Sequence, residues 1–190
     1  MSRGIPEKTK KLTMSAVLAA MGVVLLMIGA FVEMLDLSMA AIASFFCIFA
    51  VIEMRKGYPW LIYATTSILS IILMPFSLGG WCYFLFFGFY PIIKEKIEKL
   101  NRVASWIVKL GIFNILVTVF LCIFRLVFVN DFNIVIQELS AMLGGTNSVA
   151  IMTICVYAVL NLIFVLYDIT LTRLIILYLV KIRGKFKFLK

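Results

Sequence analysis

FFGFYPIIKEKIEKL, at residues 86–100, changes character at its centre, where an aromatic half gives way to lysines and glutamates. Pro91 stands at this boundary, and proline removes a backbone donor and clashes with the preceding helical turn. An apolar run with Tyr90 near its end, followed by charge, is typical of a helix that leaves a bilayer. Beyond it, Glu95 and Lys99 form a favourable i, i+4 pair. We interpret the stretch as the inner end of a membrane span followed by a connector. The alternative is that the charged half contacts a partner on that side.

The composition of the whole chain agrees with a membrane environment. Of its 190 residues, 64% are hydrophobic and 14% are charged, and the mean hydropathy is +1.14. A soluble domain is closer to half apolar, with about a quarter of its residues charged. Because a soluble fold of this size could not cover so much apolar surface, lipid must solvate most of the chain. We therefore predict an all-α integral membrane protein.

Six apolar segments meet or approach the length of about 20 residues that a helix needs to cross the hydrocarbon core. The first follows a basic start but is longer than the roughly 7–15 apolar residues of a signal peptide, so we expect it to be retained. The fourth is short. Together they predict a single six-span domain over residues 1–190, with spans at 12–35, 37–54, 58–76, 78–93, 103–129 and 148–180.

The charges of the connectors predict the orientation of these spans. Both termini and the connectors at 55–56 and 94–102 carry lysines and arginines, whereas the three opposite connectors contain none. Basic residues collect on the cytoplasmic side, so both termini are expected on the cytoplasmic side of the cell membrane. The net charge of +9 thus reflects topology, and nucleic acid is not an expected partner. The segment 130–147 is the sizeable outer connector.

Polar side chains within the apolar segments concentrate in the last two spans. Arg125 cannot lose its charge, so it must reach the surface, pair with an acid or meet an anionic ligand. Asn114 and Asn161 either hydrogen-bond across the helix pair or line the floor of a polar pocket. These three residues are the candidate substrate-binding set.

Catalytic and metal chemistry have little support in the residues. The chain has no histidine, and its four cysteines are scattered through apolar runs without metal-ligand spacing. Neither a nucleophile–base arrangement nor a glycine-rich phosphate loop is visible. We expect no enzyme, no cofactor and no metal site.

Residues 15–22, SAVLAAMG, place small side chains four residues apart at the start of the first span. Such a face lets another helix approach closely, either within this chain or from a separate membrane partner.

Ala16 and Ala20, which follow a basic Lys-Lys-Leu-Thr start, and the six-span layout give the chain a resemblance to a known family. It resembles the substrate-binding subunit of energy-coupling-factor vitamin transporters over most of its length. The resemblance implies that Ala16 and Ala20 dock to a transmembrane coupling protein driven by ATPase subunits. It also implies that a small molecule binds near the outer side, among spans 4 to 6. The first outer connector, 33–37, is shorter than the lid loop often found in that family.

Two functions follow as expectations. The first is a membrane subunit that captures a small micronutrient for uptake and works with a separate energising module. The alternative is a non-transport scaffold or regulatory protein of envelope assembly, which would need no pocket.

Overall fold

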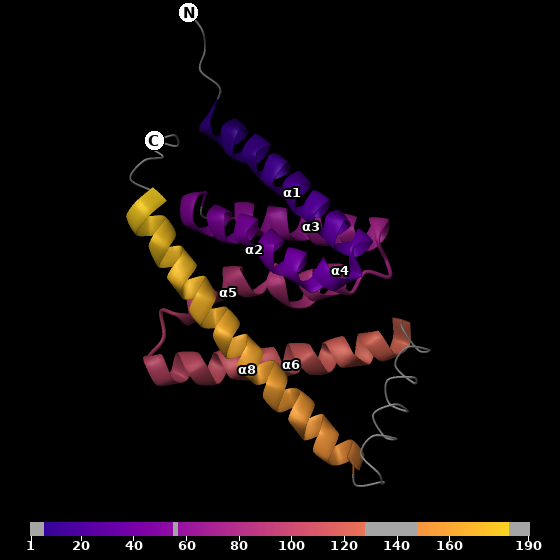
Figure 1. Ribbon diagram of the computed structural model, residues 1–190. Coiled ribbons are helices and arrows are strands. Elements are labelled where there is room, and N and C mark those ends of the chain that lie inside the picture. The colour runs from indigo at the N-terminus through magenta and orange to yellow at the C-terminus, as the bar shows by residue number, and fades with distance from the viewer. Residues whose placement is uncertain (1–5, 55–56, 128–147, 183–190) are drawn as a thin grey trace, which may run out of the picture. The chain divides into compact units, whose positions relative to one another are not determined.

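The computed structural model describes residues 6–54, 57–127 and 148–182, with the backbone alone for residues 33, 124–127, 148–153 and 182 (Figure 1). Within these ranges the chain forms helices and short turns and contains no strand. The predicted all-α class is therefore confirmed. The predicted outer connector 130–147 lies outside the described residues.

Among the described residues, four helices are long and apolar enough to cross a membrane. They belong to α1 (Glu7–Phe31), α2 (Asp36–Glu53), α6 (Arg102–Val127) and α8 (Ser148–Leu177), which continues into the π-helix η3 (Tyr178–Ile182). Helix α3 (Tyr58–Leu73) is apolar but has 16 residues, a length of about 24 Å. The observed helices begin and end within a few residues of the predicted spans.

The fourth predicted segment has three parts. Helix α4 (Leu78–Cys82) passes directly into the π-helix η2 (Tyr83–Phe87), and α5 (Tyr90–Ile97) follows a short turn. Gly88 lies in that turn, where a Cβ would be 2.7 Å from the Tyr63 ring and 2.8 Å from the Tyr83 ring. Pro91 lies in the first turn of α5, where its missing N–H breaks no helical hydrogen bond. The predicted boundary is thus a place where the helix restarts.

The chain forms two compact units, Met1–Lys109 and Leu110–Lys190. In the first, α2 packs against α1, α3, α4, η2 and α5. The face of α2 that makes these contacts is made of small side chains with no exposed surface: Ala40, Ala43, Ser44, Cys47 and Ala50. Small side chains let helix backbones approach closely, which is how helices associate when lipid is the solvent.

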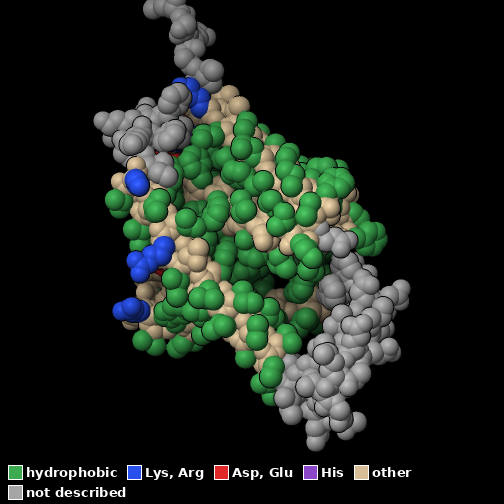
Figure 2. Space-filling model, viewed as in Figure 1, with side chains coloured by type: hydrophobic (Ala, Val, Ile, Leu, Met, Phe, Trp, Pro, Cys, Tyr) green, Lys and Arg blue, Asp and Glu red, His purple; other side chains and the backbone are tan. Residues whose placement is uncertain are grey.

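Helix α1 packs on both α2 and α3 through a second set of small residues. A Cβ at Gly22 would lie 3.1 Å from the Thr66 side chain of α3, and Thr66 Oγ1 donates to the Ala19 carbonyl at 3.4 Å. The aromatic end of this core is Tyr83, whose hydroxyl lies 3.1 Å from Cys47 Sγ. These contacts leave the apolar outer faces of α1 and α3 exposed, and hydrophobic side chains dominate the face shown in Figure 2.

In the second unit, which takes α6 from Leu110 onward, α6 and α8 cross near their middles (Figure 1). The Phe113 and Phe164 rings stack with centroids 4.4 Å apart and planes 11° apart. One turn further along α6, Thr118 Oγ1 lies 2.9 Å from the Tyr157 hydroxyl. The two helices are therefore held together by ring stacking and by polar side chains.

Candidate functional site

The first unit contains a buried carboxylate at the start of α2. Asp36 is 7% exposed, and its side chain accepts hydrogen bonds from the turn between α3 and α4. Ser77 Oγ donates to both carboxylate oxygens, at 3.0 and 3.1 Å, and the Gly79 N–H donates to Oδ2 at 2.7 Å. The carboxylate is thus held by a hydroxyl and a backbone amide from one turn.

The sequence of this turn explains why it can hold Asp36. Ser77 caps α4 by accepting the Gly80 N–H at 3.1 Å, so its own hydroxyl proton is free to point at the carboxylate. Gly79 lies so close that a Cβ there would be 2.6 Å from the Asp36 carbonyl oxygen. Trp81 Nε1 donates to the Pro75 carbonyl at 2.8 Å and closes the turn. The contact with Asp36 therefore requires a hydroxyl at position 77 and a residue without a Cβ at position 79.

An open cavity of about 720 Å³ borders this carboxylate, between the ends of α1, α2, α3 and α4. Its outer wall is exposed, since Met34 is 96% exposed, Phe31 83% and Phe76 74%. We call it the Asp36 cavity. Asp36 and Ser77 supply its polar groups, and the rest of its wall is mainly methionine, phenylalanine and leucine: Met27, Met34, Met74, Phe31, Phe76, Leu37, Leu73 and Leu78. Its volume falls in the range of about 300–1,000 Å³ that is usual for small-molecule sites.

The chemistry of the Asp36 cavity combines an apolar wall with one acid. Within the described part of the chain, Asp36 forms no ion pair, and its negative charge is met by the hydroxyl and amide donors described above. A carboxylate offers about four lone-pair positions, so it can accept a further hydrogen bond. Methionine side chains adapt to different apolar shapes. The arrangement suits a small apolar molecule that carries a donor or a positive charge.

The predicted pair Asn114 and Asn161 meet each other in the second unit. Each amide nitrogen donates to the side-chain oxygen of the other at 3.0 Å. Each also donates to a carbonyl of its own helix at 2.8 Å, Asn114 to Leu110 and Asn161 to Tyr157. All four side-chain amide protons are therefore used in hydrogen bonds. The pair bridges the two helices, which is the first of the two expected alternatives, a hydrogen bond across the helix pair.

Arg125 lies in the last turn of α6. Its side chain falls outside the described residues, so its expected role in meeting an anionic ligand stays a prediction.

The small residues at the start of α1 form two faces. Ser15 and Ala19 are buried, and Ser15 Oγ lies 3.4 Å from Met54 Sδ at the end of α2. Ala16 and Ala20 are exposed. Internal packing thus buries the face with Ser15 and Ala19. The face with Ala16 and Ala20, the two alanines of the resemblance, stays exposed in the first unit.

Asp36 and Ser77 were not among the residues predicted from the sequence. They are separated by 41 positions, and nothing in the local pattern says that they meet. A usable signal was the acid at the junction of two apolar segments, because a charge at a span end often has a specific partner.

Comparison with known protein families, with curated proteins and with solved structures gives no match to this chain.

Proposed function

We propose that the chain is a membrane-embedded subunit that captures a small molecule for uptake and works with a separate energising module. The observation that carries the proposal is the Asp36 cavity, a space of about 720 Å³ with an apolar wall and a fixed carboxylate in its floor. The connector charges predict six spans with both termini on the cytoplasmic side of the cell membrane. In that topology, this cavity opens toward the outer side.

The cavity wall suggests the class of molecule that is captured. Met27, Met74 and Phe31 favour an apolar body, and Asp36 favours a hydrogen-bond donor or a cation attached to it. Burying a charged or donor group against Asp36 is favourable because the partner carboxylate is already oriented by Ser77 and Gly79.

The second unit has a different part in the proposal. Asn114 and Asn161 hold α6 against α8, and a ligand would reach them by displacing their reciprocal hydrogen bonds. Arg125 is the proposed contact for an anionic group, since a guanidinium keeps its charge at depth.

The energising partner is proposed to dock on α1. Ala16 and Ala20 are exposed and four residues apart, so they present a shallow groove into which another helix fits closely. The proposed partner is a transmembrane coupling protein joined to ATPase subunits, since no phosphate-binding loop is present in this chain.

Co-purification tests this docking. The variant Ala16→Leu/Ala20→Leu fills the groove, and we expect it to lose the coupling and ATPase subunits that the natural chain retains in mild detergent. Mass spectrometry of the purified material identifies these proteins. Small molecules bound in the Asp36 cavity are expected to remain.

The matched control is Val17→Leu/Met21→Leu, which changes two neighbouring exposed side chains, 53% and 50% exposed, without filling the alanine groove. It should keep the partner. Retention of the partner by the Ala16→Leu/Ala20→Leu variant would remove the docking role from this face.

A scaffold or regulatory protein of envelope assembly is the second candidate. It is favoured by the Asn114–Asn161 pair, whose donors are fully used and which therefore has a sufficient structural role. This candidate predicts co-purifying envelope proteins and no small molecule, so the same experiment separates the two.

A further inference from the structure

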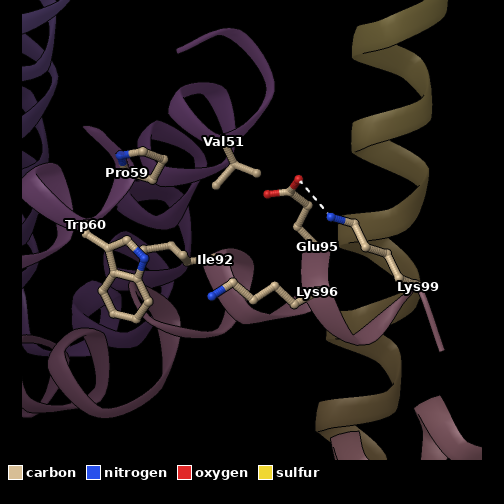
Figure 3. Close-up of a pocket in the computed structure, with 7 residues that line it drawn as sticks. All are labelled: Val51, Pro59, Trp60, Ile92, Glu95, Lys96 and Lys99. Atoms are coloured by element: carbon tan, nitrogen blue, oxygen red, sulfur yellow. Dashed lines mark ion pairs between the residues drawn. The ribbon is translucent and has the colours of Figure 1, made fainter. Parts of the chain in front are cut away.

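A second cavity lies at the opposite end of the first unit, where α2 ends and α3 begins. It has a volume of about 520 Å³ (Figure 3). It is lined by Val51 of α2, Pro59 and Trp60 of α3, Ile92, Glu95 and Lys96 of α5, and Lys99 in the turn that follows α5. We call it the Lys96 pocket. It combines aliphatic and aromatic side chains with two ammonium groups and one carboxylate, that of Glu95.

The charges around the Lys96 pocket are unevenly compensated. Lys99 lies 3.8 Å from the Glu95 carboxylate, so the charges of these two residues offset each other. Lys94, one position from Glu95, is buried and lies 3.2 Å from Glu98. Within the described parts of the chain, the Lys96 side chain forms no hydrogen bond or ion pair, and Figure 3 shows it extending toward Trp60. The pocket therefore has a net positive charge centred on Lys96.

Trp60 places the pocket at the depth of lipid headgroups. Its ring is 38% exposed and is fixed by edge-on contacts with Tyr63 and Phe89, each with centroids 5.9 Å apart. Tryptophan prefers the boundary between hydrocarbon and water. Because α3 begins at Tyr58, the pocket also lies where an apolar helix starts.

An exposed apolar stripe leads away from the pocket along α3. Leu61 is 47% exposed, Ile68 57% and Ile72 69%, and their spacing puts them on one side of the helix. An acyl chain lying on this stripe would bring its headgroup to Trp60 and Lys96. A soluble anion has no acyl chain and would not contact this apolar stripe.

We infer that the Lys96 pocket binds the phosphate headgroup of an anionic phospholipid whose acyl chain lies along α3. Lys96 supplies the net charge. Lys99, whose charge Glu95 offsets, supplies further N–H donors, and the Trp60 ring packs against the glycerol region. Basic pockets at the cytoplasmic ends of spans are suited to such headgroups. This inference does not depend on the proposed transport function.

Native mass spectrometry of the full chain tests the inference. The protein is purified in the presence of equal amounts of phosphatidylglycerol and phosphatidylcholine, and the lipids that stay bound are counted. We expect phosphatidylglycerol to be retained preferentially. The variant Lys96→Gln/Lys99→Gln should retain about tenfold less of it, because each lysine near an anionic headgroup contributes measurably to binding.

Two further variants keep the test independent of folding. Lys96→Arg/Lys99→Arg preserves the charges and should restore retention. Lys8→Gln/Lys10→Gln removes two exposed lysines of α1 and should change nothing. Equal retention of both lipids, or unchanged retention by Lys96→Gln/Lys99→Gln, would overturn the inference.

Glycerophosphate distinguishes a lipid from a soluble phosphate compound, because it carries the headgroup without acyl chains. We expect it to compete weakly with phosphatidylglycerol. Competition at equal concentration would overturn the assignment to lipid and would assign the pocket to soluble phosphate.

Discussion

At the scale of single residues, Gly79 is the position where one added methyl group would disturb the Asp36 cavity most directly. A Cβ there would lie 2.6 Å from the Asp36 carbonyl oxygen, which is backbone and cannot rotate away. Asp36 would have to move, and with it the start of α2. The hydrogen bond from the Gly79 N–H to the carboxylate would be lost as well.

Gly79→Ala is therefore expected to lower the free energy of unfolding by about 1–3 kcal/mol, as over-packed sites usually do. Thermal unfolding in detergent measures the change. Gly111→Ala is the control, since an added Cβ there meets no atom of the described chain within 4 Å. It should be neutral or stabilise α6 by about 0.5–1 kcal/mol. Equal effects of the two substitutions would contradict the packing described at Gly79.

At the scale of the elements, the Asn114–Asn161 pair is the polar link between α6 and α8. Replacing one asparagine by leucine leaves the other with an amide group lacking its partner in an apolar environment, whereas replacing both leaves none. The two substitutions should therefore be coupled.

We expect the double variant Asn114→Leu/Asn161→Leu to be less destabilised than the sum of the single variants, by about 1 kcal/mol. Thermal unfolding of the four proteins gives this coupling energy. Thr170→Val serves as the control, because Thr170 donates to the Leu166 carbonyl of its own helix at 2.8 Å. Additive single and double effects would show that the two amides do not depend on each other.

The elements also show what the sequence could predict. Apolar length predicted the helices closely, but α1 begins at Glu7, five residues before the predicted span. Its first turns are charged and carry the i, i+4 pair of Glu7 and Lys11, so apolar length does not detect them. The division of residues 78–97 could not be predicted. It depends on two rings that lie against Gly88, that of Tyr83 five residues earlier and that of Tyr63 in α3.

The Asp36 cavity was not predicted from the sequence, since its polar residues, Asp36 and Ser77, were outside the candidate set. Polar residues inside apolar segments are conspicuous, so Asn114 and Asn161 could be selected, and one of the two expected alternatives was a hydrogen bond between them. The position of Asp36 between two apolar segments indicates that it has a specific partner, but it does not identify Ser77 and Gly79, which are 41 and 43 positions away. The identity of partners at this range depends on how the helices pack.

At the scale of the whole molecule, the six-span prediction can be tested by labelling cysteines with a reagent that does not cross membranes. The four native cysteines are first replaced, and single cysteines are placed at Met34, Gly57 and Phe76. Six spans with both termini inside predict that Met34→Cys and Phe76→Cys are labelled in intact cells. Gly57→Cys should be labelled after permeabilisation. Labelling of Gly57→Cys and Phe76→Cys from the same side would contradict a crossing by α3.

Mass spectrometry of molecules carried through purification tests most directly whether the Asp36 cavity captures a small molecule. The variant Ala30→Trp fills the cavity from α1, and Ile68→Trp adds the same ring to an exposed position of α3. We expect one small molecule, with an apolar body and a donor or cationic group, in the natural chain and in Ile68→Trp, and its loss in Ala30→Trp. No bound molecule in the natural chain, or equal amounts in both variants, would contradict the claim.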